Sequence, residues 1–244
     1  MGKTIGIFGM SGEGKSTSTI INPDGTCVFS DPEYSYLEHP ELYLGMNPKE
    51  HFIINTDMKD LPFPPVFWND ANKNYVETKD FAIIKQLIEY CAKAKHIKSV
   101  AIDTLNLYLA YKEYNDRKRL SFDQWRDIAN DIIELTTLCN DTLRADQLAY
   151  VMGHIELITD VNGEEKKVLS VIGKKSKKQM PEGFFPICLF TNVEYDGYGN
   201  NIHSFETKAN KSSAKTPIGM FNDFKIPNSL KLVDTTIRKY YKLI

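Results

Sequence analysis

Residues 9–16 form a glycine-rich segment with the spacing GxxxxGK[ST]. The apolar run 4–8 precedes this segment and predicts a short buried strand, and residues 15–21 predict the start of a helix. Glycines in such a loop let backbone N–H groups turn inward around phosphates, and the helix directs its positive end at the same anion. A strand, a loop and a helix in this order therefore predict a phosphate-binding unit within an α/β fold.

The residue types in the loop indicate a site for ATP and Mg²⁺. The Lys15 ammonium reaches the β- and γ-phosphates in sites of this kind, and the Ser16 hydroxyl ligates magnesium. A chance glycine-rich turn is the alternative, and average residue usage gives that pattern in about 1% of chains this long. The predicted nucleotide-binding residues are Gly9, Met10, Ser11, Gly12, Glu13, Gly14, Lys15, Ser16 and Thr17.

Apolar runs and helical periodicities alternate along the rest of the 244 residues, which we expect to form a single domain. Expected strands lie at 26–29, 52–54, 99–103, 148–152, 187–195 and 203–207, and expected helices at 81–88, 122–143 and 228–241. This order predicts an α/β fold with a mostly parallel central sheet flanked by helices and an antiparallel C-terminal extension. The stretch 35–79, with the proline-rich run 61–65, reads as an insertion or irregular region.

Three side chains follow predicted strands in positions suited to phosphate chemistry. Asp103 ends the run 99–103, where an acid holds magnesium through water, although such an acid also caps the next element. Glu33 can orient and deprotonate an attacking water, or it is an exposed loop acid. His154 can sense the γ-phosphate by hydrogen bonding, and a structural histidine is the alternative.

In this order along the chain, these elements resemble the core of the RecA-type recombinases. They are more similar to the short phage-encoded ATPases of that superfamily, known as AAA-family ATP-binding or single-strand-annealing proteins. The resemblance implies a RecA-like P-loop NTPase core in which Lys15, Glu33 and His154 are catalytic. It also implies that Ser16 and Asp103 hold the metal.

Two lysine-rich regions gain roles from the same resemblance. One is similar to the family's stretch whose lysines reach a neighbouring subunit's γ-phosphate, which implies a homo-oligomeric ring or filament; a solvated strand edge is the alternative. In the family, the loop after the sensor contacts single-stranded DNA, and 155–183 reads here as a mobile basic loop, or as a hairpin that its lysines merely solubilise. The candidates acting in trans are Lys208, Lys211 and Lys215, and the DNA-binding candidates are Lys174, Lys175, Lys177 and Lys178.

Composition limits which ligands, metal sites and cellular locations we expect for this chain. The net charge of −2 means that any nucleic-acid contact requires a local basic patch. Besides the lysines at 174–178, the basic stretch 117–119 is a second candidate for such a contact. The four cysteines lie far apart without a CxxC pair, which argues against a zinc site or a disulfide framework. No apolar run reaches the length of a membrane span, so we expect a cytoplasmic protein, in the host cell if phage-encoded.

We therefore expect an Mg-ATP-hydrolysing protein of phage-type DNA recombination that binds or anneals single-stranded DNA. A single-strand-binding or recombination protein is a possible partner class. One alternative is a P-loop nucleotide kinase-like phosphotransferase, although such enzymes clamp phosphates with several arginines and only Arg117, Arg119 and Arg126 cluster here. The other alternative is an ATP-binding switch module for a protein partner.

Overall fold

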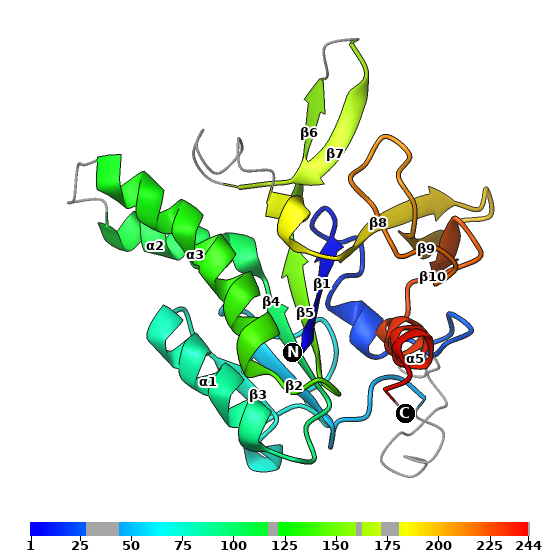
Figure 1. Cartoon of the computed structure of the whole chain (residues 1–244). Helices are drawn as coiled ribbons and strands as arrows, with labels where there is room; N and C mark the ends of the chain where they lie inside the picture. Colours follow the sequence, from blue (N-terminus) through cyan, green and yellow to red (C-terminus); the bar gives the residue numbers. More distant parts are fainter. Residues whose placement is uncertain (28–43, 117–121, 160–162, 172–180, 244) are drawn as a thin grey trace.

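The computed structural model describes residues 1–27, 44–116, 122–159, 163–171 and 181–243. Within these residues, eight strands form one sheet in the order β10-β9-β8-β1-β5-β4-β2-β3 (Figure 1). The strands are β1 (Lys3–Phe8), β2 (His51–Asn55), β3 (Tyr75–Glu77), β4 (Ser99–Asp103), β5 (Leu148–Gly153), β8 (Ile187–Tyr195), β9 (Asn201–Glu206) and β10 (Lys225–Pro227).

The pairing of these strands confirms the expected α/β fold. Every neighbouring pair from β8 to β3 is parallel. The strands β9 and β10 extend the sheet in antiparallel orientation. The strand that precedes the phosphate loop, β1, is separated from the acid-bearing strand β4 by β5. The sheet thus has the mostly parallel centre and the antiparallel C-terminal extension expected from the sequence.

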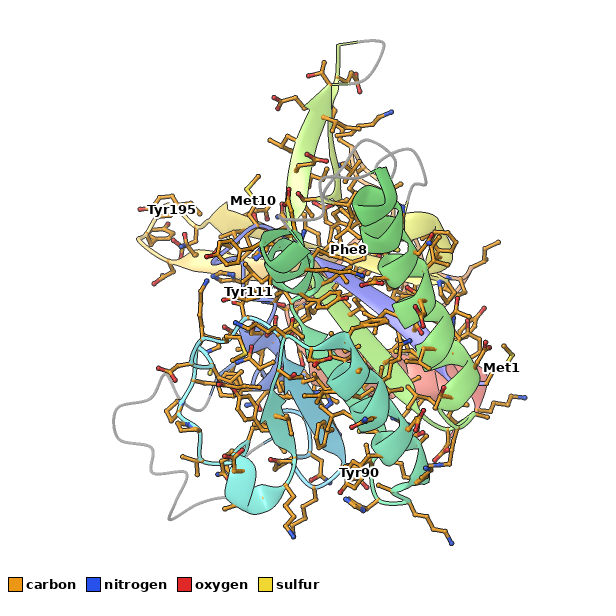
Figure 2. All side chains as sticks on the ribbon, turned by 90° about the vertical axis from the view of Figure 1, so that its left-hand side faces the viewer. Met1, Phe8, Met10, Tyr90, Tyr111 and Tyr195 are labelled. Carbon is orange, nitrogen blue, oxygen red and sulfur yellow. The ribbon has the colours of Figure 1, made fainter. Side chains whose placement is uncertain are left out.

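Helices cover both faces of the sheet. The helices α1 (Phe81–Lys93), α2 (Leu105–Asp116) and α3 (Phe122–Thr142) lie over one face, and α5 (Leu230–Tyr241) lies over the other (Figure 1). Figure 2 shows the first face, with the three helices in front of the strands. In the part of the chain that the structure describes, no helix is long and apolar enough to cross a membrane.

The sheet has a hydrophobic core on each side because successive residues of a strand point to opposite faces. In β1, Ile5 and Ile7 join the core under α5, and Phe8 joins the core under α1, α2 and α3. In β5, Tyr150 belongs to the first core and Val151 to the second, and both are fully buried. These strands are mostly apolar since both of their faces are covered.

A two-stranded ribbon stands apart from this sheet. The strand β6 (Ile155–Thr159) pairs antiparallel with β7 (Glu165–Leu169), and the ribbon projects beyond the body of the molecule at the end of β5 (Figure 1). Residues 155–159 and 165–169, which were expected to lie in a mobile basic loop over 155–183, form these two strands instead. A short 3₁₀-helix, η5 (Pro181–Phe184), follows, and residues 172–180 lie outside the described residues.

The expected helix at 15–21 is wrong. Only a 3₁₀ turn, η1 (Thr17–Thr19), forms after the loop. Serines and threonines favour local hydrogen bonds over helix, and the Ser18 hydroxyl donates to the Lys15 carbonyl oxygen at 2.5 Å. Pro23 follows at once and cannot extend a helix. The loop thus lacks the long helix whose dipole was expected to face the phosphates.

Two further expectations need correction. The stretch 35–79 was expected to be an insertion or irregular region around a strand at 52–54. That strand forms as β2, but β3 was not expected, and both belong to the parallel sheet, with 3₁₀-helix η4 (Asp70–Asn72) between them. In the expected strand at 26–29, Thr26 and Cys27 are not in a strand, and residues 28 and 29 lie outside the described residues. The helix α2 was not anticipated.

Candidate functional site

The phosphate loop lies where the parallel strands of the sheet end. In open α/β sheets, ligands bind outside the carboxyl ends of the strands. Here the loop follows β1, His154 follows β5, Asp103 ends β4 and Asp57 lies two residues beyond β2. These four segments enclose a cavity of about 240 Å³ that contains Lys15, Ser16, Asp57, Asp103 and His154 in its lining.

The Lys15 ammonium points inward and is almost fully buried. Its Nζ donates hydrogen bonds to the carbonyl oxygens of Gly9 at 2.8 Å and Met10 at 2.7 Å. Burial lowers the pKa of Lys15, and the nearby Asp103 and Glu13 carboxylates partly oppose that shift. Binding of a triphosphate would exchange these carbonyl acceptors for phosphate oxygens, which are stronger partners for an ammonium.

Contacts from distant segments fix the shape of the loop. Gly12 and Gly14 adopt φ angles of 80° and 86°, a region that favours glycine. The Glu13 Oε2 atom accepts from the Met10 backbone N at 2.7 Å and from the Thr191 hydroxyl at 2.6 Å. The Asn228 side chain donates from Nδ2 to the Gly14 carbonyl oxygen at 3.0 Å. Glu13 therefore uses its side chain to tie the loop to β8.

Ser16 and Asp103 form the part of the site suited to magnesium. The Ser16 hydroxyl donates a hydrogen bond to Asp103 Oδ2. The other oxygen, Oδ1, is buried and has no hydrogen-bond partner among the described residues. A hydroxyl and a carboxylate are hard oxygen ligands of the kind that Mg²⁺ takes. This pair therefore fits a metal ion that also contacts a bound triphosphate.

The electrostatics of Asp103 favour a cation at this position. The pKa of Asp103 is raised to about 6: burial is the main cause and the Asp57 carboxylate contributes, while the Ser16 hydrogen bond and the Lys15 ammonium oppose the shift. A buried carboxylate with an unpartnered oxygen is costly unless a charge or a proton compensates it. A divalent cation would supply that compensation.

Asp57 is a site residue that the sequence interpretation missed. The backbone N–H groups of Thr56 and Asp57 donate to the Asp103 carbonyl oxygen at 2.6 and 3.3 Å, so the two acids lie at neighbouring strand ends. The Thr104 hydroxyl donates to Asp57 Oδ1 at 3.4 Å. An acid shortly after an apolar strand was the same pattern that identified Asp103, but Asp57 lay in the stretch taken as irregular.

His154 lies where the sequence predicted, at the end of β5. Its Nδ1 is 3.4 Å from Lys15 Nζ, and its backbone N–H donates to Asn106 Oδ1. Burial lowers the pKa of His154, and the Lys15 ammonium lowers it further, although Asp57 opposes the shift. The imidazole is therefore neutral near pH 7 and able to exchange hydrogen bonds with a phosphate.

The other predicted residues are not part of this cavity in the described structure. Glu33 and the lysines 174, 175, 177 and 178 lie outside the described residues, as does the stretch 117–119. Lys208 and Lys211 are exposed; Lys208 Nζ donates to the Asn222 carbonyl oxygen at 2.9 Å. Lys215 pairs through its backbone with Cys188 of β8. None of the three lines the phosphate cavity of its own chain.

The four cysteines carry no part of the site. All are free thiols, with Cys91, Cys139 and Cys188 buried and Cys27 half-buried. Burial raises the pKa of the Cys91, Cys139 and Cys188 thiols to about 12, so these thiols stay protonated and act as small apolar side chains.

Comparison with known proteins gives a structural likeness and no sequence match. No family model matches the chain, and no curated protein matches it. Among solved structures, the chain is similar to a KaiC-like protein of the hyperthermophilic archaeon Pyrococcus horikoshii OT3. The likeness has a TM-score of 0.45 and 10% sequence identity, and it covers 88% of this chain and 83% of that chain. The fold assignment therefore rests on the strand order and the loop described above.

Proposed function

We propose that this protein binds ATP with Mg²⁺ and hydrolyses it. The observation that carries the proposal is the hydrogen bond from Ser16 to Asp103, in the same cavity as Lys15 and His154. That cavity supplies a cation for the phosphates, a hydroxyl and a carboxylate for the metal, and a neutral imidazole beside the lysine. Mg²⁺, when bound, neutralises charge that develops on the β- and γ-phosphate oxygens.

The chain's own groups account for the remaining requirements of hydrolysis. Lys15 holds the transferring phosphate, and His154 contacts it from the end of β5. A carboxylate takes a proton from the attacking water. The water oxygen bonds to the γ-phosphorus, and the bond between that phosphorus and the ADP oxygen breaks. The resemblance assigns that carboxylate to Glu33, and Asp57 is a second candidate because it lines the cavity.

Phosphate release from ATP by the full-length chain tests this proposal. We expect Mg²⁺-dependent turnover that Lys15→Ala abolishes by removing the phosphate-binding cation. A matched control is Lys93→Ala, because Lys93 lies at the end of α1 away from the cavity. Wild-type protein that neither binds nor hydrolyses ATP would overturn the proposal.

We further propose that single-stranded DNA is the second ligand, in annealing or assisted recombination. Three features support it. The ribbon β6–β7 begins directly after His154, it projects from the body (Figure 1), and its strand β7 carries Lys166 and Lys167. The Ser170 backbone N–H donates to the His154 carbonyl oxygen at 2.8 Å, which ties the base of the ribbon to the proposed sensor.

DNA binding is tested by ATP turnover with and without single-stranded DNA. We expect stimulation that falls steeply with salt, because lysine contacts to phosphates release counterions. Replacement of Lys174, Lys175, Lys177 and Lys178 by alanine should remove the stimulation and leave turnover without DNA unchanged. Turnover and gel mobility that DNA leaves unaltered would exclude this ligand.

The same proposal includes assembly into a ring or filament, with Lys208, Lys211 or Lys215 acting on a neighbouring copy. The exposure of Lys208 and Lys211 supports this role. The mass of the assembly, measured with and without ATP, tests it. An oligomer whose turnover survives alanine at all three positions would remove these lysines from the mechanism. A single-strand-binding or recombination protein remains the proposed partner class.

Phosphoryl transfer to a small acceptor is the second candidate. A cavity of about 910 Å³ adjoins the phosphate cavity, and the two share Asp60, Leu61 and Pro62. Among the described residues its lining includes Asp60, Asp70 and Glu77 but no lysine or arginine, which disfavours a phosphorylated acceptor such as a nucleotide. ADP formation without phosphate release, when nucleosides are supplied, would favour this candidate over hydrolysis.

A further inference from the structure

A cavity of about 690 Å³ lies on a different side of the phosphate loop. It shares Gly12, Gly14 and Thr17 with the phosphate cavity, whereas Lys15 and Asp103 line the phosphate cavity alone. Its other walls include Glu194 of β8, parts of β9 and β10, and the turn before residue 26. These segments lie together beside η1 and α5 (Figure 1).

The loop gives any bound triphosphate a direction. In such sites the lysine and the metal-binding hydroxyl and acid mark the β- and γ-phosphates. The remainder of the nucleotide must therefore leave the loop away from Lys15, Asp103 and His154. The 690 Å³ cavity adjoins the loop at Gly12, Gly14 and Thr17 without those three groups. The 910 Å³ cavity, in contrast, adjoins the phosphate cavity near Asp60, on the side where Asp57 lies and away from Gly14 and Thr17.

The walls of the 690 Å³ cavity combine exposed apolar side chains with acidic groups. Ile202 on β9 is 53% exposed and lies in the lining with Pro227. The cavity also contains the carboxylates of Asp24 and Glu194, and the Lys225 ammonium is paired with Glu194. This charge disfavours phosphate, so the apolar surface remains as the binding element. Nucleobases bind to such surfaces through their apolar faces.

The cavity walls and the phosphate loop are joined directly. The Gly14 carbonyl oxygen accepts from Asn228, and the Glu13 carbonyl oxygen lies 3.3 Å from His203 Nδ1. A carbonyl oxygen only accepts, so this His203 nitrogen carries the proton in that contact. The Oδ1 of Asn228 is buried without a hydrogen-bond partner in the described part of the chain. A ligand in this cavity thus lies against residues that hold the loop.

We propose that this cavity binds the nucleoside of the triphosphate, with the nucleobase against Ile202 and Pro227. The inference rests on the proposed ATP binding, and it adds the direction of the nucleotide and the residues that hold its base. It also makes β9 and β10, the antiparallel extension of the sheet, part of the nucleotide site.

The test compares two ligands on three variants by calorimetric titration in Mg²⁺. ATP carries the nucleoside, and inorganic tripolyphosphate probes the phosphate loop alone. We expect Ile202→Ser to weaken ATP about tenfold, since an apolar contact is lost, and to leave tripolyphosphate affinity unchanged. Lys15→Ala should weaken both ligands. Tyr198→Ser is the matched control, because Tyr198 is 92% exposed in the same hairpin and outside the cavity.

The outcomes separate the two proposals. If Ile202→Ser binds ATP as tightly as wild type does, the nucleoside lies elsewhere and this inference fails while ATP binding stands. If wild-type protein binds neither ligand, the proposed function itself fails. A loss of tripolyphosphate affinity in Ile202→Ser would mean that the substitution disturbs the loop, which would also overturn a role confined to the nucleoside.

Discussion

The hydroxyl of Ser16 donates a hydrogen bond to the carboxylate of Asp103, although β1 and β4, which place the two residues, are not neighbours in the sheet. The strand β5 lies between them and ends at His154. The carboxyl ends of the three parallel strands β1, β4 and β5 therefore place the phosphate loop, Asp103 and His154 at the same edge of the sheet. Each of them is buried on both faces, so the position of these strand ends is fixed by the core on either side.

The first prediction concerns Asp103→Asn. We expect phosphate release to fall at least ~100-fold, because the metal loses a charged ligand. We also expect the metal-free protein to become more stable by up to about 3 kcal/mol at pH 7.5, since burial raises the pKa of this carboxylate from 3.8 to about 6 and one pKa unit corresponds to ~1.4 kcal/mol. Urea unfolding in EDTA measures the gain. Asp141→Asn, on the exposed surface of α3, should change neither quantity.

The second prediction separates Asp57 from Glu33. If Asp57 activates water, Asp57→Asn should lower kcat at least ~100-fold and leave the KM for ATP within about threefold. Glu33→Gln should then retain most of its turnover. The reverse result would assign the base to Glu33 and leave Asp57 with a structural role beside Asp103. Rapid-quench measurement of the hydrolysis step distinguishes the two variants, because it excludes product release.

The third prediction uses His51, which is fully buried at the start of β2, the opposite end of that strand from Asp57. The pKa of His51 is lowered to about 3, mainly by burial and in smaller part by the nearby Arg238 guanidinium. The unfolded chain binds a proton near pH 6.5, so the contribution of neutral His51 is full above that pH and is lost as pH falls toward 3.

We therefore expect the advantage of wild type over His51→Gln to shrink by about 1.4 kcal/mol per pH unit below pH 6. Chemical unfolding of both proteins between pH 5 and 8 measures it. The difference between the two proteins is the informative quantity, because Asp103, whose pKa is raised, titrates with the opposite sign over part of this range. A difference that is constant with pH would contradict the buried neutral state of His51.

Some of this architecture follows from local sequence and some does not. The strands β1, β4 and β5 were predicted because runs buried on both faces are continuously apolar. The helix α2 was missed because Leu105, Leu107 and Leu109 repeat every two residues, a spacing that does not indicate a helix. Asp57 was missed because it lay in the stretch taken as irregular, although it follows the expected strand at 52–54 much as Asp103 ends the run 99–103.

The last prediction concerns Asn106, which joins His154 at the phosphate cavity to the base of the ribbon. It lies in the first turn of α2, three residues after Asp103; its Oδ1 accepts from the His154 backbone N, and its Nδ2 donates to the Ser170 carbonyl oxygen. Asn106→Asp keeps the acceptor for His154 and removes the donor to the ribbon. We expect ATP turnover without DNA within about threefold of wild type and DNA stimulation largely lost, because only the contact to the ribbon is broken.

The control for that experiment is Asn106→Ala, which removes both contacts. This variant leaves the His154 N–H without its acceptor and should also lower the free energy of unfolding by about 1–3 kcal/mol. If Asn106→Asp kept full DNA stimulation, the ribbon would sense the nucleotide by another route, through the Ser170 to His154 backbone bond alone. If both variants lost turnover without DNA, Asn106 would position His154 for hydrolysis and would not couple it to the ribbon.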